Sequence, residues 1–165
     1  MRLLPAFFRR DHAPMKGFKV QQPVDLYICV TCQPEADRAA RPGKILYQNM
    51  LAELENHPSS FASSEGSPSA RHPSVKPKDD GNGVRLHAVE CLCVCKRPCT
   101  VAVSSPEKWT YIIAGLDPVS DVGALCQYLD VYAVSEFGTP PLSSRPAAIK
   151  NGTVARIPPG VPYAT

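Results

Sequence analysis

Cysteines are the residues of this 165-residue chain whose number and spacing point most directly to chemistry. The chain has seven, and six of them form two tight groups. The first group is Cys29 and Cys32, and the second is Cys91, Cys93, Cys95 and Cys99. A thiolate is a strong ligand for soft metal ions, and four thiolates satisfy either an iron–sulfur cluster or a tetrahedral zinc ion. The two groups therefore predict a metal–thiolate site.

The thiols are expected to be reduced. Their count is odd, and the second group holds four within nine residues, too close for easy mutual disulfide geometry. The apolar run at residues 3–8 is shorter than the hydrophobic region of a secretory signal, and no small-residue cleavage site follows it. These features predict a cytoplasmic protein. Met15 is an alternative start to Met1, because residues 1–14 show no periodic pattern.

Composition narrows the class of protein. With 44% hydrophobic and 20% charged residues, the chain can bury the core of one domain. A net charge of only +3 argues against a nucleic-acid binder that works by neutralising phosphates. No apolar run approaches the roughly 20 residues needed to cross a bilayer, so no membrane is expected as a partner.

Hydrophobic spacing predicts alternating strands and helices around the thiols. The predicted strands are residues 24–30, 84–90, 100–103 and 109–114. Leu46, Met50 and Leu54 lie four residues apart and predict a helix over residues 42–56. A second apolar helical face runs through residues 117–133, and an Asp-Pro cap opens it. The order is a β-α-β unit followed by β-β-α.

This order explains how the two thiol groups meet. A helix between two strands makes the strands parallel, nearly always through a right-handed crossover. Cys29 and Cys32 end the first strand, and the second group follows the second strand directly. If these strands are neighbours, both groups lie at the same edge of the sheet.

The motifs resemble a known family. Cys29-Val-Thr-Cys32, the run from Cys91 to Ala102 and the segment Gly152–Pro159 match motifs of a bacterial family of unknown function labelled as predicted metal-binding proteins. The topology and the thiol positions also resemble those of thioredoxin-like [2Fe–2S] ferredoxins. Those proteins carry two cysteines after the first strand and a Cys-x-x-x-Cys pair after the second.

The resemblance implies a fold and a ligand set. The fold is α/β and thioredoxin-like, a mixed sheet with flanking helices, a disordered insertion and irregular tails. The implied ligands of a [2Fe–2S] cluster, or alternatively of zinc, are Cys29, Cys32, Cys91 and Cys95, with Cys99 as the substitute. This chain departs from the ferredoxin pattern in having only two residues between its first two cysteines, and in having a cysteine at 99 where those proteins tend to have glycine.

Domain boundaries follow composition. We expect a flexible segment at residues 1–22, a metal-binding domain at 23–137, and a Pro-rich C-terminal extension at 138–165. Residues 57–83 are rich in serine, proline and glycine and predict a flexible insertion. Within the extension, Asn151-Gly152 predicts the turn of a short hairpin.

Other residues near the motifs have simpler expected roles. Cys93 alternates in direction with Cys91 and Cys95 and is expected to point away, and Cys126 lies on an apolar helical stripe and is expected in the core. His87 is expected to be a satisfied structural histidine on the strand face opposite Leu86. Two roles are open for Lys96 and Arg97. They either offset the negative charge of a thiolate-bound cluster or dock a partner, or they are simply two solvated charges.

Three functions remain in competition. The first is a small [2Fe–2S] ferredoxin-like electron carrier or redox accessory with a redox protein as partner, which the resemblance links to cobalamin and cobalt metabolism. The second is a structural zinc–thiolate interaction module. The third is a thioredoxin-like thiol oxidoreductase at Cys29 and Cys32, but its helix would begin about ten residues after Cys32, too late to lower a thiol pKa. We expect an electron-transfer or metal-binding protein rather than an enzyme, and a homodimer stays open.

Overall fold

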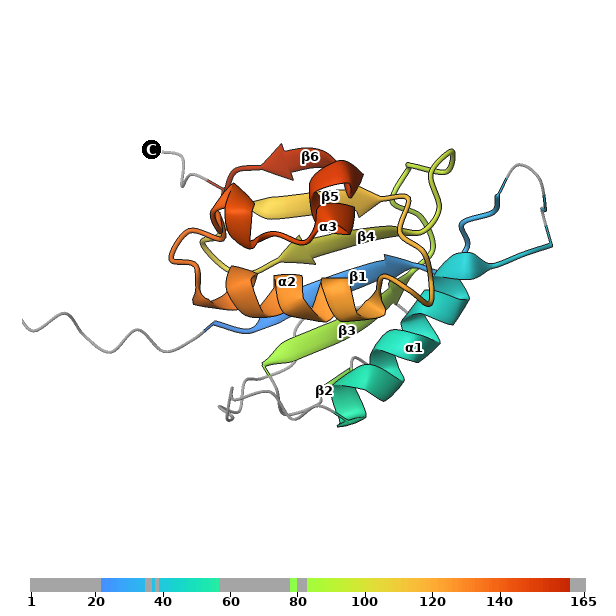
Figure 1. The fold of residues 1–165 in the computed structure, drawn as a ribbon, viewed down its shortest axis with the longest axis horizontal. Helices are drawn as coiled ribbons and strands as arrows, with labels where there is room; N and C mark the ends of the chain where they lie inside the picture. Colours follow the sequence, from blue (N-terminus) through green and yellow to red (C-terminus); the bar gives the residue numbers. More distant parts are fainter. Residues whose placement is uncertain (1–21, 35–36, 38, 57–77, 80–82, 161–165) are drawn as a thin grey trace, which may run out of the picture.

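The computed structural model describes residues 22–34, 37, 39–56, 78–79 and 83–160. Its central element is one six-stranded sheet with the strand order β2-β3-β1-β4-β5-β6 (Figure 1). The strands are β1 (Val24–Cys29), β2 (Lys78–Asp79), β3 (Val84–Val89), β4 (Thr100–Ser104), β5 (Thr110–Ala114) and β6 (Thr153–Ile157). The helices are α1 (Pro42–Asn56), α2 (Val122–Val134) and α3 (Ala147–Gly152), with a short 3-10 turn at Leu142–Ser144.

The sheet is mixed, as the sequence predicts. Strand β1 runs parallel to β3, with Cys29 opposite Val89. It runs antiparallel to β4, and the pairs β4–β5, β5–β6 and β2–β3 are antiparallel as well. The predicted order of β-α-β followed by β-β-α is therefore confirmed, and β2 and β6 extend the sheet at its two edges.

The core lies between one face of the sheet and the helices. Alternating strand residues such as Leu26, Ile28 and Leu86 point to this side and are fully buried. Helix α1 contributes Leu46, Met50 and Leu54, the three residues whose spacing predicts it. Helix α2 contributes Leu125 and Leu129, together with two tyrosines that pack edge to face with Tyr111 of β5; these are Tyr128 and Tyr132.

The C-terminal part corrects the sequence-based prediction. Asn151-Gly152 is not a hairpin turn: both residues end helix α3, and the strand that follows pairs with β5. Gly152 is needed there for packing, because a Cβ at this position would come within 2.9 Å of the Ala114 carbonyl oxygen. The C-terminal extension is thus partly integrated into the sheet.

Helix α2 also begins later than predicted, at Val122 rather than at Pro118. The Asp117 carboxylate accepts hydrogen bonds from the backbone amides of Val119 and Ser120, and this local interaction stabilises a turn before the helix.

The expected flexible insertion falls mostly on residues 57–77 and 80–82, which lie outside the described residues, as do residues 1–21. The C-terminal end of the insertion differs from the prediction, because Lys78–Asp79 forms β2 and pairs with Arg85 and Leu86 of β3.

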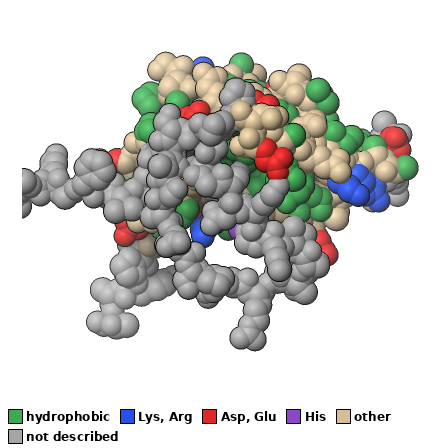
Figure 2. Space-filling model, turned by 90° about the horizontal axis from the view of Figure 1, so that it is seen from below, with side chains coloured by type: hydrophobic (Ala, Val, Ile, Leu, Met, Phe, Trp, Pro, Cys, Tyr) green, Lys and Arg blue, Asp and Glu red, His purple; other side chains and the backbone are tan. Residues whose placement is uncertain are grey.

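Seen from the β2 side (Figure 2), hydrophobic and acidic side chains are interspersed over the described surface, and basic side chains gather near one end. Among the described residues, no helix is long and apolar enough to span a bilayer.

Candidate metal centre

The two cysteine groups meet at one edge of the sheet. Because β1 and β3 are parallel neighbours in register, their carboxyl ends lie side by side (Figure 1). The backbone continues this pairing past the strand ends, where the Val30 amide donates to the Val89 carbonyl at 2.9 Å. The loop with the second cysteine group starts one residue later. The sequence-based prediction of a common edge is confirmed.

Cys29 and Cys32 form a contacting pair of thiols. Their Sγ atoms are 3.1 Å apart, and both residues are buried, with exposed fractions of 1% and 3%. Helix α1 packs directly against the Cys29 backbone, because a Cβ on Gly43 would overlap the carbonyl oxygen of Cys29. Gly43, the second residue of α1, allows the helix to pack closely against the Cys29 backbone.

Hydrogen bonds join the Cys29–Cys32 turn to the start of the second cysteine loop. The Cys29 thiol donates to the Glu90 carbonyl oxygen at 3.4 Å, and the Thr31 hydroxyl donates to the same oxygen. Thr31 lies between the two cysteines, and sequence reasoning assigned it no role. Its position inside the Cys-x-x-Cys motif is the signal that could have identified it.

The second group divides into an exposed set and a buried cysteine. Cys91, Cys93 and Cys95 are exposed, whereas Cys99 is fully buried. Cys91 Sγ lies 3.8 Å from Cys93 Sγ and accepts a hydrogen bond from the Cys93 amide at 3.2 Å. Cys93 therefore turns towards Cys91, contrary to the prediction that it points away, because its backbone is left-handed with φ of 59° rather than extended.

The far end of the loop is fixed to the rest of the fold. Cys99 extends the β4–β5 ladder, since its amide and carbonyl both bond to Leu116. The Arg97 guanidinium donates to the carbonyls of Ala114 and Asn151, at 3.3 and 3.2 Å. Arg97 thus connects the cysteine loop to β5 and to the end of α3, a structural role beyond the two that the sequence suggested.

The thiols differ in acidity. Burial raises the pKa of Cys29, but hydrogen bonds from Cys32, Thr31 and the Leu92 backbone outweigh it and lower that pKa below 9.0. Burial and the Cys29 thiolate raise the pKa of Cys32 to about 11. Burial raises the pKa of Cys99 to about 12, with a smaller contribution from the charge of Cys32. Of the three buried thiols, Cys29 is thus the one whose pKa is lowered, whereas the pKa values of Cys32 and Cys99 are raised.

Interaction with Cys91 raises the pKa of both Cys93 and Cys95, and the charge of Cys29 adds to both shifts. The charge of Cys29 therefore reaches thiols of the second group as well as Cys32. Within the described residues, however, no three cysteine, histidine or acidic side chains are arranged as a set that could hold a metal ion as they stand. The structure brings Cys29 and Cys32 together and places Cys91 and Cys95 at the same edge, so the four-ligand set stays a prediction.

The donor chemistry at this edge fits a thiophilic metal centre. Two buried thiols come from one strand end, and exposed thiols on a short loop come from its parallel neighbour. Soft sulfur ligands of this kind select zinc or iron–sulfur clusters over the hard cations magnesium and calcium.

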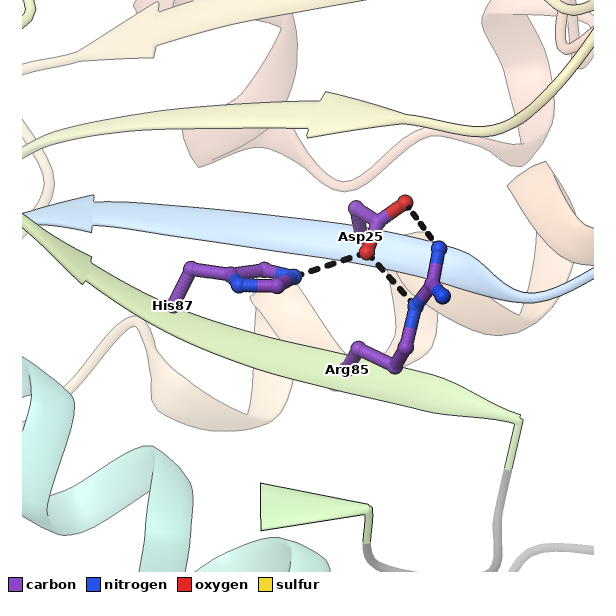
Figure 3. A network of polar contacts seen from close by, with 3 residues as sticks. All are labelled: Asp25, Arg85 and His87. Carbon is purple, nitrogen blue, oxygen red and sulfur yellow. Dashed lines mark hydrogen bonds and ion pairs between the residues drawn. The ribbon is translucent and has the colours of Figure 1, made fainter. Parts of the chain in front are cut away.

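A polar cluster occupies the opposite end of the same strand pair (Figure 3). Asp25 binds Arg85 through both carboxylate oxygens, at 2.8 and 2.7 Å, and His87 Nε2 lies 2.7 Å from Asp25 Oδ1. The His87 ring stacks on Tyr27 with centroids 4.6 Å apart. His87 is the satisfied structural histidine that the sequence predicts. Sequence reasoning missed its partner, although a lone aspartate in an apolar strand opposite alternating Arg and His is a recognisable signal.

Cys126 packs as predicted, partly buried against the core on α2. Burial raises the pKa of its thiol to about 11. Its side chain packs against the core, and among the described residues no hydrogen bond joins it to the other six cysteines. We therefore treat Cys126 as a packing residue.

Comparisons with known proteins agree with this architecture. A family model described as "Protein of unknown function (DUF1636)" matches residues 69–159, more than half of the chain. The solved structure of a thioredoxin-like [2Fe–2S] ferredoxin from Aquifex aeolicus is similar over 85% of this chain and 98% of that chain, with a TM-score of 0.50 and 12% sequence identity. At this identity the likeness shows a thioredoxin-like fold. No curated protein matches the chain.

Proposed function

The chain belongs to the DUF1636 family of proteins of unknown function, and we propose that it is a metal–thiolate protein that holds a [2Fe–2S] cluster as a small ferredoxin-like electron carrier or redox accessory. One observation carries the proposal: two cysteine groups from distant parts of the sequence lie at the carboxyl ends of the parallel strands β1 and β3. The fold likeness to a [2Fe–2S] ferredoxin supports the same proposal.

Cys29, Cys32, Cys91 and Cys95 are the proposed ligands, with Cys99 as the substitute. When bound, a [2Fe–2S] cluster supplies one-electron transfer, and its potential depends on burial and on hydrogen bonds to the sulfurs. Burial of Cys29 and Cys32 excludes water from one side of the site, whereas the exposed loop gives a partner access to the other. A redox protein is the expected partner.

The second candidate is a structural zinc site built from the same thiols. Tetrahedral zinc takes four cysteine ligands without redox chemistry, and the donors at this edge suit it equally well. What separates the two candidates is the identity of the metal, because the ligand residues are shared.

Single Cys-to-Ser variants test the ligand set. Serine keeps the shape of cysteine but is a poor ligand for iron and zinc, so Cys29→Ser, Cys32→Ser, Cys91→Ser and Cys95→Ser should each lose metal. Metal loss should also lower the thermal stability, because binding is linked to folding. The measurement is metal content per chain together with the unfolding temperature.

Cys126→Ser is the matched control, and it should keep its metal while losing about 1–2 kcal/mol of stability for a hydroxyl in a partly apolar interface. If Cys99→Ser strips the metal and Cys29→Ser does not, the ligands are Cys32, Cys91, Cys95 and Cys99 instead. If every one of these variants keeps its full metal content, the proposed site is wrong.

A further inference from the structure

The two buried thiols at the sheet edge are placed for a second chemistry. Cys29 Sγ and Cys32 Sγ are 3.1 Å apart, so a disulfide bond, with its length of about 2.05 Å, needs them to approach by only about 1 Å. In the exposed loop, the Sγ atoms of Cys91 and Cys93 are farther apart, at 3.8 Å. The two residues between Cys29 and Cys32 form a turn that already holds the thiols side by side.

Contacts that do not involve the two sulfurs hold the surroundings of the pair. The Cys29 backbone is held in β1 by pairing with β3 on one side, and Gly43 of helix α1 packs against it on the other. The Thr31 hydroxyl holds the turn to the Glu90 carbonyl. Disulfide formation therefore requires movement of side chains and of the Cys32 end of the turn, rather than of the sheet.

We propose that Cys29 and Cys32 are also a reversible dithiol–disulfide couple, and that its oxidation closes the metal site. The inference rests on the proposed function, because it concerns the same two ligands. A thiolate is the species that binds metal, whereas a sulfur in a disulfide has no charge to offer. The oxidised chain would lose two ligands at once, and a bound metal would in turn keep the pair from forming a disulfide.

The step balances with a small disulfide, such as oxidised glutathione, as the oxidant. One thiolate of the pair attacks a sulfur of the small disulfide, which forms a mixed disulfide and releases one thiol. The second thiolate then attacks the protein sulfur of the mixed disulfide, which forms the Cys29–Cys32 bond and releases the second thiol. The pair is oxidised by two electrons, the small disulfide is reduced by two, and the two protons go to the released thiols.

The sequence makes this couple easy to measure. Trypsin cleaves after lysine and arginine but not before proline, so it should place Cys29 and Cys32 together on peptide 20–38. The exposed set falls on peptide 86–96, and Cys99 falls on peptide 97–108. Alkylation before and after reduction, followed by mass spectrometry, thus assigns a disulfide to one group.

The experiment compares the metal-free and metal-loaded full chain in buffers with increasing ratios of oxidised to reduced glutathione. In the metal-free chain, we expect peptide 20–38 to form its internal disulfide before peptide 86–96 does. In the metal-loaded chain, peptide 20–38 should stay reduced at the same ratio. The oxidised chain should fail to take up metal, and dithiothreitol should restore uptake.

Cys32→Ser removes the couple, and Cys126→Ser is the control that should behave like the wild type. The inference is overturned if peptide 86–96 oxidises first, if peptide 20–38 only accumulates mixed disulfides, or if the oxidised chain still binds its full metal content. Failure of the proposed function gives a different result. The fully reduced chain then takes up no metal, so there is no metal site for the disulfide to close.

Discussion

The two ends of the β1–β3 strand pair both carry polar or thiol side chains and differ in how the hydrogen-bonding groups of these side chains are satisfied. At one end, Asp25 is paired with Arg85 and His87, so that each oxygen of the carboxylate has a partner (Figure 3). At the other end, the Cys32 thiol donates to Cys29 Sγ, and the Cys29 thiol donates to the Glu90 carbonyl. At the Asp25 end, the hydrogen bonds of the carboxylate are satisfied within the protein. At the cysteine end, the thiols can still bind a metal.

The comparison separates structural from functional polar groups. A buried carboxylate needs compensating charges and hydrogen bonds, and the Asp25 cluster supplies them from adjacent strands. A cysteine needs much less, because a protonated thiol behaves as a small hydrophobic group. Burying Cys29 and Cys32 is therefore compatible with the fold without a metal, and their grouping with three exposed thiols is what points to function.

The largest effect on stability is expected from Gly43→Ala, at the sulfur end. The added methyl would overlap the carbonyl of Cys29, and since that atom belongs to the backbone of β1, helix α1 would have to move. We expect a loss of about 2–3 kcal/mol and a reduced metal content, measured by chemical denaturation and metal analysis.

Gly123→Ala is the matched control. Its added methyl meets open space on α2, so it should raise stability by about 0.5–1 kcal/mol and leave metal content unchanged. Equal stabilities for the two variants would show that α1 does not pack against the cysteine motif as described.

Asp25→Asn removes the negative charge from the Asp25–Arg85–His87 cluster and keeps the shape of the side chain. The amide keeps one oxygen acceptor but turns an NH₂ group towards Arg85 or His87, leaving a partly buried donor without its charged partner. We expect a loss of about 1–3 kcal/mol with full metal content. Asp130→Asn, on an exposed position of α2, should change neither quantity. A loss of metal in Asp25→Asn would contradict the independence of the two ends.

The polar end should also make stability sensitive to acid. Burial raises the pKa of Asp25, but hydrogen bonds from His87 and Arg85, together with their charges, hold it below 3.8. A depressed pKa stabilises the fold above the unfolded value, and this contribution is lost as the pH falls through the folded value. The stability difference between the wild type and Asp25→Asn should therefore shrink as the pH falls below the ordinary value of 3.8 and through the lower folded value. A constant difference would contradict the ion pair.

Arg97→Lys should have the smallest effect. Lysine keeps the charge but loses the planar group that reaches both the Ala114 and Asn151 carbonyls. Because Arg97 is exposed, we expect a loss below about 1 kcal/mol with metal retained. Lys96→Arg, at the exposed neighbouring position, should be silent. Loss of metal in Arg97→Lys alone would give this guanidinium a direct role in the site.

Much of this arrangement could be predicted from the sequence. The β-rich runs and the spacing of Leu46, Met50 and Leu54 define the β-α-β unit, and that unit alone brings both cysteine groups to one edge. The prediction of a hairpin turn at Asn151-Gly152 was wrong. A turn dipeptide is a local signal, whereas the short helix α3 is held by packing of Gly152 against β5.

The contacts within the site were harder to predict. The left-handed backbone of Cys93 turns its thiol towards Cys91, and alternation along an extended loop gives the opposite answer. The role of Gly43 depends on the close approach of α1 to Cys29, which no periodicity encodes. The choice of four ligands among six thiols likewise depends on side-chain geometry around the metal, and it stays a prediction.

The most direct test of the central claim is the metal content and visible absorption of the wild-type chain purified without oxygen. A [2Fe–2S] centre predicts about two irons and about two inorganic sulfides per chain, with charge-transfer bands in the visible region. A colourless chain with one zinc would contradict the electron-carrier function and favour the structural zinc site. A chain without iron or zinc would contradict the metal–thiolate site itself.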